Sequence, residues 1–293
     1  MLEAMKSTEL RALLQQPTIL AVPGVADALT ARLVEDAGFL AVYAAGAGIA
    51  NAQYAMPDIG LMTMTEMVEA IRRIVEAVNI PVVADADTGY GAVRNVVRTV
   101  EMYERAGVAA LQVEDQITPK ICGHFSGKEV IAADDMARKI RAAVRARQDM
   151  LIIARTDCLA TDGLEEAIRR GNLFAEAGAD LILVEAPTDK DDIAALPKRI
   201  HAPLIFNMTE GASTPMMAHD ELEELGYKMV VHPSLTVRIA ARAVQSALAV
   251  LQKTHSSELL MSTMLDWDER QRLTRFAEWN ALDQELDRVV QAR

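Results

Sequence analysis

The chain has 293 residues, with 42 acidic against 30 basic residues and a formal net charge of −12. An acidic chain without a run of Lys or Arg lacks the electrostatic footprint of a nucleic-acid or anionic-membrane binder, so we expect neither partner. The longest apolar runs, such as residues 39–45, are far shorter than the about 20 residues of a spanning helix, and the N-terminus has no signal-peptide layout. Two cysteines make no disulfide framework. We therefore expect a soluble, cytoplasmic protein that binds small molecules.

Short apolar runs recur along the chain, each too brief for a helix, and longer segments with helical spacing of apolar residues separate them. The runs lie at 18–22, 40–44, 81–84, 109–113, 151–154, 181–184, 204–206 and 229–231. The clearest helical segments lie at 64–78, 93–106, 133–144 and 164–177. Four helix candidates end in glycine just before the next run, where a left-handed residue can close a helix: Gly38, Gly107, Gly178 and Gly226.

Continuously apolar strands are buried on both faces, which favours parallel pairing under a cover of helices. Eight strand and helix units predict a (β/α)8 TIM-type barrel over residues 1–245. A doubly wound open sheet is the alternative, but the glycine-rich dinucleotide fingerprint is absent after the first strand. Residues 246–293 are polar and helical in pattern with an apolar stripe. They predict a C-terminal helical extension that packs on its own barrel or on another subunit.

Acidic residues follow the apolar runs, where a parallel barrel places its active site. Asp85 and Asp87 come after the third run, Glu114 after the fourth, and Asp58 lies in a matching position after the second. Gathered carboxylates repel one another unless a hard cation neutralises them, and Mg²⁺ takes one or two carboxylates together with waters. The alternative is that these acids cap the following helices. We predict a metal site of Asp85, Asp87 and Glu114 for Mg²⁺, with Mn²⁺ as a second choice of ion.

The segment 118–128 is long, polar and rich in Gly and Pro, a composition typical of a mobile lid. It contains Cys122 close to His124 and two lysines, which suggests a thiol that acts as nucleophile or proton donor. Buried packing is the ordinary role of a lone cysteine, and we assign that role to Cys158 instead.

Arg155 stands at a strand end, where its fork suits bidentate capture of a carboxylate. A salt bridge to a neighbouring strand-end acid is the alternative. Asn207 and Thr209 can donate to a second carboxylate. For His232 we favour a satisfied strand-end histidine over a catalytic one.

Together these motifs resemble the isocitrate lyase and phosphoenolpyruvate mutase superfamily over residues 23–238. They are Pro-Asp-Ile-Gly at 57–60, Asp-Ala-Asp-Thr-Gly-Tyr-Gly at 85–91, Val-Glu-Asp-Gln at 113–116, Lys-Ile-Cys-Gly-His at 120–124 and Ala-Arg-Thr-Asp at 154–157. The Cys-Gly-His core is similar to the lyase branch, which includes isocitrate, methylisocitrate and 2,3-dimethylmalate lyases and the related oxaloacetate hydrolases. The chain is too short for an isocitrate lyase.

The resemblance implies a Mg²⁺-dependent carbon–carbon lyase of the 2-methylisocitrate or 2,3-dimethylmalate type. Such an enzyme cleaves a 2-hydroxy di- or tricarboxylate to a 2-oxo acid such as pyruvate and a second carboxylate. The alternatives are an oxaloacetate hydrolase, a carboxyphosphonoenolpyruvate phosphonomutase and an inactive metabolite-binding homologue. The resemblance also implies a homotetramer whose C-terminal helix is exchanged between subunits.

The resemblance assigns catalytic roles to residues at the strand ends and in the lid. Cys122 protonates the carbanion, and Tyr43 is the candidate base. Arg155, with help from Asn207 and His124, stabilises the developing charge or binds the second carboxylate. The expected substrate-binding residues are Ala45, Gly46, Ala47, Asp58, Gly123, Glu185, Asn207, Thr209 and Arg238.

Three positions depart from the methylisocitrate lyase pattern. Ala45 replaces a serine, Ile121 replaces a basic residue before the cysteine, and Leu183 replaces a phenylalanine beside the substrate. These departures point to a different pocket wall and limit the assignment of the substrate.

Overall fold

The computed structural model describes residues 2–125 and 127–291 of the chain. These residues divide into two compact units, Met1–Val237 and Arg238–Arg293. The division falls inside helix α11 (Leu235–Thr254), ahead of the predicted boundary after residue 245. The extents of the predicted barrel and extension therefore stay predictions.

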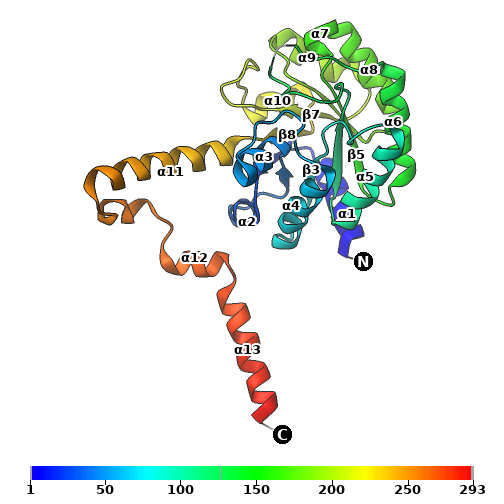
Figure 1. The fold of residues 1–293 in the computed structure, drawn as a ribbon. Coiled ribbons are helices and arrows are strands. Elements are labelled where there is room, and N and C mark those ends of the chain that lie inside the picture. The colour runs from blue at the N-terminus through cyan, green and yellow to red at the C-terminus, as the bar shows by residue number, and fades with distance from the viewer. Residues whose placement is uncertain (1, 126, 292–293) are drawn as a thin grey trace. The chain divides into compact units, whose positions relative to one another are not determined.

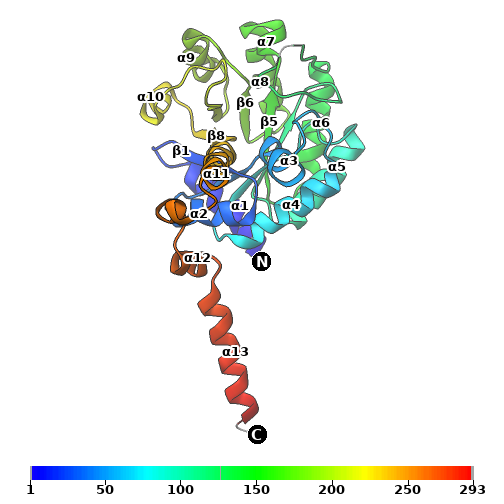
Figure 2. The same ribbon diagram turned by 60° about the vertical axis from the view of Figure 1, so that its left-hand side comes forward.

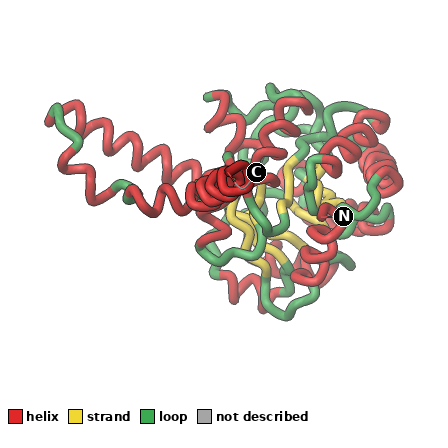
Figure 3. The backbone as a smooth tube through the Cα atoms, turned by 90° about the horizontal axis from the view of Figure 1, so that it is seen from below, coloured by secondary structure: helices red, strands yellow, loops and turns green. Residues whose placement is uncertain are grey.

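The first unit is a closed barrel of parallel strands, in which each strand pairs with the next and the last pairs with the first. The strands are β1 (Leu20–Val25), β2 (Val42–Ala44), β3 (Val82–Asp85), β4 (Ala110–Glu114), β5 (Leu151–Thr156), β6 (Leu181–Val184), β7 (Leu204–Asn207) and β8 (Met229–His232). Figure 3 shows the strands in yellow with helices in red around them. The predicted (β/α)8 TIM-type barrel is confirmed.

Helices follow the strands along the chain, and α4, α5 and α6 lie side by side outside the barrel (Figures 1 and 2). The helices of this unit are α1 (Leu2–Leu14), α2 (Ala28–Asp36), α3 (Gly46–Tyr54), α4 (Met64–Ala77), α5 (Val93–Arg105), α6 (Ala133–Ala146), α7 (Leu159–Asp162), α8 (Leu164–Glu176), α9 (Lys190–Arg199) and α10 (His219–Leu225). The four helical segments predicted most clearly correspond to α4, α5, α6 and α8. Helix α3 has no predicted counterpart, because its small residues show no helical spacing of large apolar side chains.

Local signals in the sequence set the ends of several helices. Thr63 and Glu66 form a capping box at the start of α4, with Thr63 N donating to Glu66 Oε2 at 2.8 Å. The predicted closing glycines have positive φ angles, at 88° for Gly38, 87° for Gly107, 102° for Gly178 and 104° for Gly226. Both signals are local, so they could be predicted without the tertiary fold.

Side chains along each strand alternate between the barrel interior and the surrounding helices. The buried interior cluster includes Leu10, Leu14, Val22, Tyr43, Val83, Ile153, Leu183, Ile205 and Val231. Leu10 and Leu14 come from α1, which packs on the interior cluster. The strand residues in between join a second, outer cluster with the helices, for example Ala84, Ile152, Ala154 and Ile182. By this alternation Asp85, Glu114 and Arg155 continue the interior face at the strand ends, whereas Asp115 and Thr156 face the helices.

The second unit is helical in its described part, as the sequence predicts. Most of α11 belongs to it, and it continues with the 3-10 helix η1 (Glu258–Thr263), α12 (Trp267–Leu273) and α13 (Phe276–Gln291). Several of its large apolar side chains are exposed, including Leu259, Trp267 and Trp279. Among the helices of residues 2–125 and 127–291, none combines the length and apolar character of a membrane span.

Candidate active site

A cavity of about 350 Å³ lies at the carboxyl ends of the barrel strands. Its lining is formed by Tyr43, Ala45, Gly46, Ala47, Asn51, Pro57, Asp58, Asp85, Cys122, Gly123, His124, Phe125, Arg155, Glu185, Asn207, Thr209, Pro233 and Ser234. Every predicted catalytic and substrate-binding residue of the first unit is in this set. Arg238 belongs to the second unit, and its role stays a prediction.

The three predicted metal ligands are buried at the ends of β3 and β4. Asp87 N donates to Asp85 Oδ1 at 3.1 Å, which ties these two residues together. Burial raises the pKa of Asp87 to about 6 and the pKa of Glu114 well above its usual range. A β-carbon on Gly46 would lie 2.8 Å from Asp85 Oδ2, so only glycine leaves room for this carboxylate.

Asp85, Asp87 and Glu114, which we call the carboxylate cluster, have oxygen atoms that a cation can bind. Glu114 Oε1 is buried with no hydrogen-bond partner among the described residues, and Asp87 Oδ1 has an ion pair to Lys120 at 3.0 Å but no aligned hydrogen bond. No three acidic, His or Cys side chains of residues 2–125 and 127–291 form a closed ligand set, so the predicted trio is not a complete metal cage. Mg²⁺ needs only one or two carboxylates and keeps several waters, so the residues present fit this ion.

Lys120, one of the two lysines near Cys122 in the sequence, is a buried cation whose acidic partners the sequence does not predict. Its Nζ pairs with Asp58 and with Asp87. Burial lowers the pKa of Lys120, but Asp87, Glu114 and Asp58 together raise it well above its usual range. The ammonium thus neutralises part of the carboxylate cluster. The one sequence feature that pointed to Lys120 is its position two residues before Cys122 in a charged loop.

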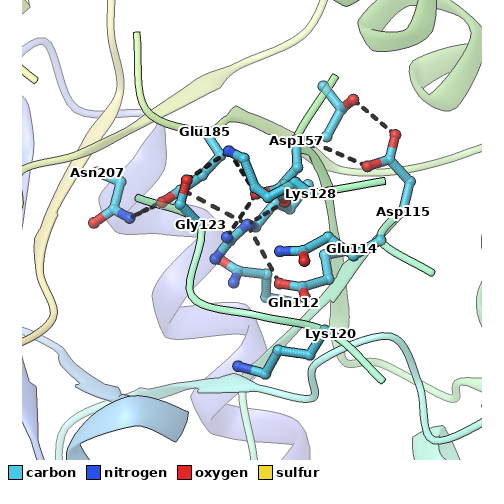
Figure 4. Close-up of polar contacts among 12 residues, drawn as sticks. Gln112, Glu114, Asp115, Lys120, Gly123, Lys128, Asp157, Glu185 and Asn207 are labelled. Carbon is cyan, nitrogen blue, oxygen red and sulfur yellow. Dashed lines mark hydrogen bonds and ion pairs between the residues drawn. The ribbon is translucent and has the colours of Figure 1, made fainter. Parts of the chain in front are cut away.

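The lid segment is anchored on both sides of Cys122. Gln116 exchanges hydrogen bonds with the Ile121 backbone, at 3.1 Å to its N–H and 3.0 Å to its carbonyl. Lys128 Nζ donates to the Gly123 carbonyl and lies 3.4 Å from Asp157 Oδ1, as Figure 4 shows. A β-carbon on Gly123 would lie 2.3 Å from Arg155 Nη2. The lid backbone therefore rests directly on the Arg155 guanidinium.

The two cysteines differ as the sequence predicts. Cys122 lines the cavity, and burial raises the pKa of its thiol although a hydrogen bond from the His124 backbone opposes this. Cys158 is fully buried among apolar side chains, and burial raises its pKa to about 12. Both thiols therefore stay protonated near neutral pH, but only Cys122 can give its proton to a ligand in the cavity.

Arg155 is held more tightly than the sequence suggested. Its Nε and Nη2 atoms bond both oxygens of Asp157 at 2.9 and 3.0 Å, and Glu114 and Glu185 lie 3.4 and 3.6 Å from its Nε. The salt bridge named as the alternative is therefore present, and Asp157 was missed as its partner. Only the other edge of the guanidinium is left for a ligand. Asn207 orients Glu185, because its amide nitrogen donates to both Glu185 oxygens at 3.0 Å.

Behind β4 and β5 lies a second buried polar group, which we call the scaffold cluster: Asp115, Thr156 and Arg170. Asp115 accepts hydrogen bonds from the Thr156 hydroxyl at 2.7 Å, from Asp157 N at 2.9 Å and from Arg170 Nη1 at 2.9 Å. Figure 4 shows Asp115 on the opposite side of β4 from Glu114. The scaffold cluster locks the backbone that carries Arg155 and Asp157.

Side chains from α5 and α6 hold the loop after β3 in the same way. Tyr103 Oη donates to the Asp85 carbonyl at 3.1 Å, Thr99 Oγ1 to the Gly89 carbonyl at 3.2 Å, and Lys139 Nζ to the Thr88 carbonyl at 3.0 Å. These donors were not identified from sequence, because nothing in the pattern of a helix shows which loop carbonyl its side chains reach.

His232 faces away from the cavity and has partners on both ring nitrogens. Its Nδ1 lies 2.8 Å from Glu210 Oε1 and its Nε2 lies 2.9 Å from His219 Nε2. The interpretation as a satisfied histidine is confirmed.

Comparison with known proteins gives consistent matches over nearly the whole chain. The family model described as phosphoenolpyruvate phosphomutase matches residues 10–252. The 2,3-dimethylmalate lyase of Eubacterium barkeri is 41% identical over 90% of this chain and 92% of its own, and the 2-methylisocitrate lyase of Aeropyrum pernix is 41% identical over 96% and 91%.

Two solved structures bear on the fold and the site. A crystal structure of 2,3-dimethylmalate lyase, a superfamily member, superimposes with a TM-score of 0.90 at 35% identity, covering 96% of this chain and 95% of its own. A phosphonopyruvate hydrolase solved with oxalate and Mg²⁺ gives a TM-score of 0.87 at 29% identity, covering 95% and 98%.

Proposed function

Because the chain belongs to the phosphoenolpyruvate mutase and isocitrate lyase superfamily, we propose that it cleaves the C2–C3 bond of a 2-hydroxy di- or tricarboxylate. The products are a 2-oxo acid such as pyruvate and a second carboxylate. The observation that carries the proposal is that Cys122 and Tyr43 line one cavity with Arg155 and with Asp85 of the carboxylate cluster.

Asp85 and Asp87 are the proposed direct ligands of Mg²⁺, with Glu114 as a further ligand or a partner of its waters. The unbonded oxygens and raised pKa values of Asp87 and Glu114 support this assignment. When bound, the ion supplies positive charge that stabilises an oxyanion on the substrate. Mn²⁺ has similar ligand preferences and is the alternative ion.

Tyr43 and Cys122 are the proposed proton carriers. The substrate hydroxyl proton passes to an ionised Tyr43, the oxygen electron pair forms the new C2 carbonyl, and the C2–C3 pair stays on C3. C3 then takes the proton of the Cys122 thiol, and proton return from Tyr43 to the thiolate resets the site. Burial and nearby carboxylates raise the pKa of Tyr43 while Arg155 lowers it, so ionisation of Tyr43 depends on added positive charge at the strand ends.

The remaining residues bind and orient the substrate. Arg155 presents its free edge to a carboxylate and carries a permanent charge beside the developing oxyanion. Because Gly123 has no side chain, the lid backbone can approach Arg155. The next lid residue, His124, lies 3.4 Å from Glu185. Gly46 and Ala47 bring backbone N–H groups at the start of α3, which suit an anionic group, whereas the Ala45 N–H donates to the Val25 carbonyl at 3.3 Å.

A coupled assay for pyruvate tests this function. With Mg²⁺, 2,3-dimethylmalate or 2-methylisocitrate should release pyruvate, and a chelator should abolish the release. Oxalate from oxaloacetate without pyruvate from either malate-type acid would instead identify a hydrolase. Absence of both pyruvate and oxalate with all of these substrates would favour a phosphonomutase or an inactive binding protein.

We also propose a cytoplasmic homotetramer in which the second unit contributes a subunit interface. The exposed Leu259, Trp267 and Trp279 side chains support this assignment, because so many apolar groups are rarely left in water. Light scattering after gel filtration should give a mass of four chains. A monomer at micromolar concentration would contradict it.

A further inference from the structure

Two histidine rings, which we call the histidine pair, meet outside the cavity. His232 is the last residue of β8 and His219 is the first residue of α10. Their Nε2 atoms lie 2.9 Å apart and their ring centroids 5.2 Å apart. Neither residue lines the cavity, and the proposed lyase chemistry uses neither. The histidine pair is therefore a polar group that the proposed function does not explain.

Glu210 sets the tautomer of His232. Its carboxylate oxygen Oε1 lies 2.8 Å from His232 Nδ1. Because a carboxylate only accepts hydrogen bonds, Nδ1 carries the ring proton, and Nε2 of the neutral ring keeps its lone pair. Metal-binding histidines in proteins are oriented in the same way, by an acceptor on the ring nitrogen that does not bind the ion.

His219 completes the contact from the other side. Since the lone pair of His232 faces it, His219 Nε2 supplies the single proton between the two nitrogen atoms. Partial burial lowers the pKa of His219, His232 lowers it further, and Asp220 opposes both effects. The His219 ring is thus neutral near neutral pH, and a neutral imidazole is the form that binds a metal ion.

The spacing of the two nitrogen atoms is close to what one ion needs. Two Zn–N bonds of about 2.0 Å at the tetrahedral angle hold their nitrogen atoms about 3.3 Å apart. The Nε2 atoms at 2.9 Å must therefore separate by about 0.4 Å, and the rings must tilt so that both lone pairs meet at the ion. The His219 side chain is exposed, so its ring can make this movement.

The number and type of ligands decide which ion fits. Within the part of the chain that the structure describes, no third His, Cys, Asp or Glu side chain completes a ligand set at the histidine pair. Water reaches the exposed His219 ring and can fill the remaining positions. Imidazole nitrogen suits Zn²⁺, Ni²⁺ and Cu²⁺, whereas Mg²⁺ prefers oxygen ligands. The histidine pair and the carboxylate cluster should therefore select different ions.

We propose that the histidine pair binds a transition-metal ion, Zn²⁺ in particular, through its two Nε2 atoms, with Glu210 orienting His232 and water completing the coordination. Binding moves the His219 proton from Nε2 to Nδ1 by way of solvent, so both rings stay neutral and both lone pairs face the ion. The ion then joins the start of α10 to the end of β8. This site lies outside the cavity lining, so the proposal does not depend on the lyase function.

Calorimetry with Zn²⁺ on the full chain tests the site, in Mg²⁺ sufficient to fill the carboxylate cluster. The parent should bind one Zn²⁺ per chain at the histidine pair. His219→Ala should weaken this binding by at least about a hundred-fold, more than the loss of an orienting partner does. His201→Ala is the matched control, because it removes an exposed histidine outside the pair, and it should bind as the parent does. An unchanged Zn²⁺ isotherm in His219→Ala, or no Zn²⁺ binding by the parent, would overturn the proposal.

Zn²⁺ can also bind the carboxylate cluster, so the binding events must be told apart. Asp85→Ala should keep the event that His219→Ala loses, and circular dichroism should show that both variants are folded. If Asp85→Ala removes the event and His219→Ala keeps it, the ion binds the carboxylate cluster and the histidine pair is no metal site.

Glu210→Gln tests the orienting role of the carboxylate. It should weaken the same Zn²⁺ event by about ten- to a hundred-fold, because an amide does not fix the proton on His232 Nδ1. Full affinity in this variant would overturn the role of Glu210.

Cu²⁺ gives a direct readout of the ligands. With one equivalent of Cu²⁺ per chain and the same Mg²⁺, the electron paramagnetic resonance spectrum of the parent should show coupling to two imidazole nitrogens. His219→Ala should lose this pattern and His201→Ala should keep it. A parent spectrum with oxygen ligands alone would overturn the proposal.

Discussion

Glu114 and Asp115 are consecutive acids with opposite roles in this barrel. Both are fully buried, with exposures of 1% and 0%. Glu114 faces the barrel interior, where one of its oxygens has no hydrogen-bond partner among the described residues, whereas Asp115 faces the helices and accepts three hydrogen bonds. An unsatisfied buried carboxylate marks the side built for a ligand, and a satisfied one marks the side built for stability.

The pKa shifts separate the two sides further. Burial raises the pKa of both carboxyl groups, but hydrogen bonds from Asp157 and Thr156 oppose the shift in Asp115, and Glu114 has only charge interactions against it. Substitutions on the cavity side should therefore change activity and metal binding. Substitutions in the scaffold cluster should change stability first.

The largest expected effect comes from Asp85→Ala on the cavity side. Loss of a proposed direct ligand should lower Mg²⁺-dependent turnover by more than about a thousand-fold, since a metal ion supplies several kcal/mol of charge stabilisation. Calorimetry with Mg²⁺ should show weakened binding, and urea unfolding should show a folded protein. Asp134→Ala, on the exposed start of α6, is the control. Full activity of Asp85→Ala in chelator would reject the metal site.

Cys122→Ser should lower turnover by about a hundred- to ten-thousand-fold, because a hydroxyl is a much weaker acid than a thiol. Binding of Mg²⁺ and of product should change little. Cys158→Ser is the matched control, since that thiol is outside the cavity, and it should keep its turnover. Near-normal cleavage by Cys122→Ser would remove the thiol from the role of proton donor.

Asp115→Ala tests the scaffold cluster. It leaves Arg170 and two further donors without their shared acceptor, so the free energy of unfolding should fall by about 3 kcal/mol in urea titrations. Turnover of the folded fraction should fall much less than in Asp85→Ala. A variant as stable as the parent would show that this cluster does not hold the strands.

Metal binding should weaken in acid. Since burial raises the pKa of Asp87 to about 6, protons compete with Mg²⁺ below that pH, and affinity should fall by up to about ten-fold per pH unit. The same carboxyl is ionised above pH 6, so affinity should level off there. Calorimetric titrations between pH 5 and 8 measure this, and a flat profile across pH 6 would contradict a role for Asp87 as ligand.

The smallest expected change in stability belongs to Glu114→Gln. A neutral amide of the same shape removes a buried charge that has an unbonded oxygen, so the free energy of unfolding should change by less than about 1 kcal/mol or rise. Mg²⁺-dependent turnover should still fall. Destabilisation as large as that of Asp115→Ala would erase the contrast between the two faces of β4.

The sequence by itself determined the barrel, the family and most of the cavity wall. Apolar runs, helical spacing and closing glycines such as Gly107 act within a few residues of chain, so they can be read without the fold. The parallel strands end at one edge, so residues following them, such as Asp85 and Arg155, were expected to meet. The predicted barrel, family and lyase class are confirmed.

The tertiary structure alone decided how the charges are shared. Asp157 occupies one edge of Arg155, which was expected to bind a substrate carboxylate, and Lys120 pairs with Asp58 and Asp87, which were expected to bind substrate and metal. The Lys120 pairs join side chains from different loops, so they depend on the position of the lid, whereas the Arg155 pair joins two residues at the end of one strand and depends on how their side chains are oriented. Sequence spacing does not show which of these contacts form, because Coulomb and hydrogen-bond energies depend on distances and angles that only packing determines.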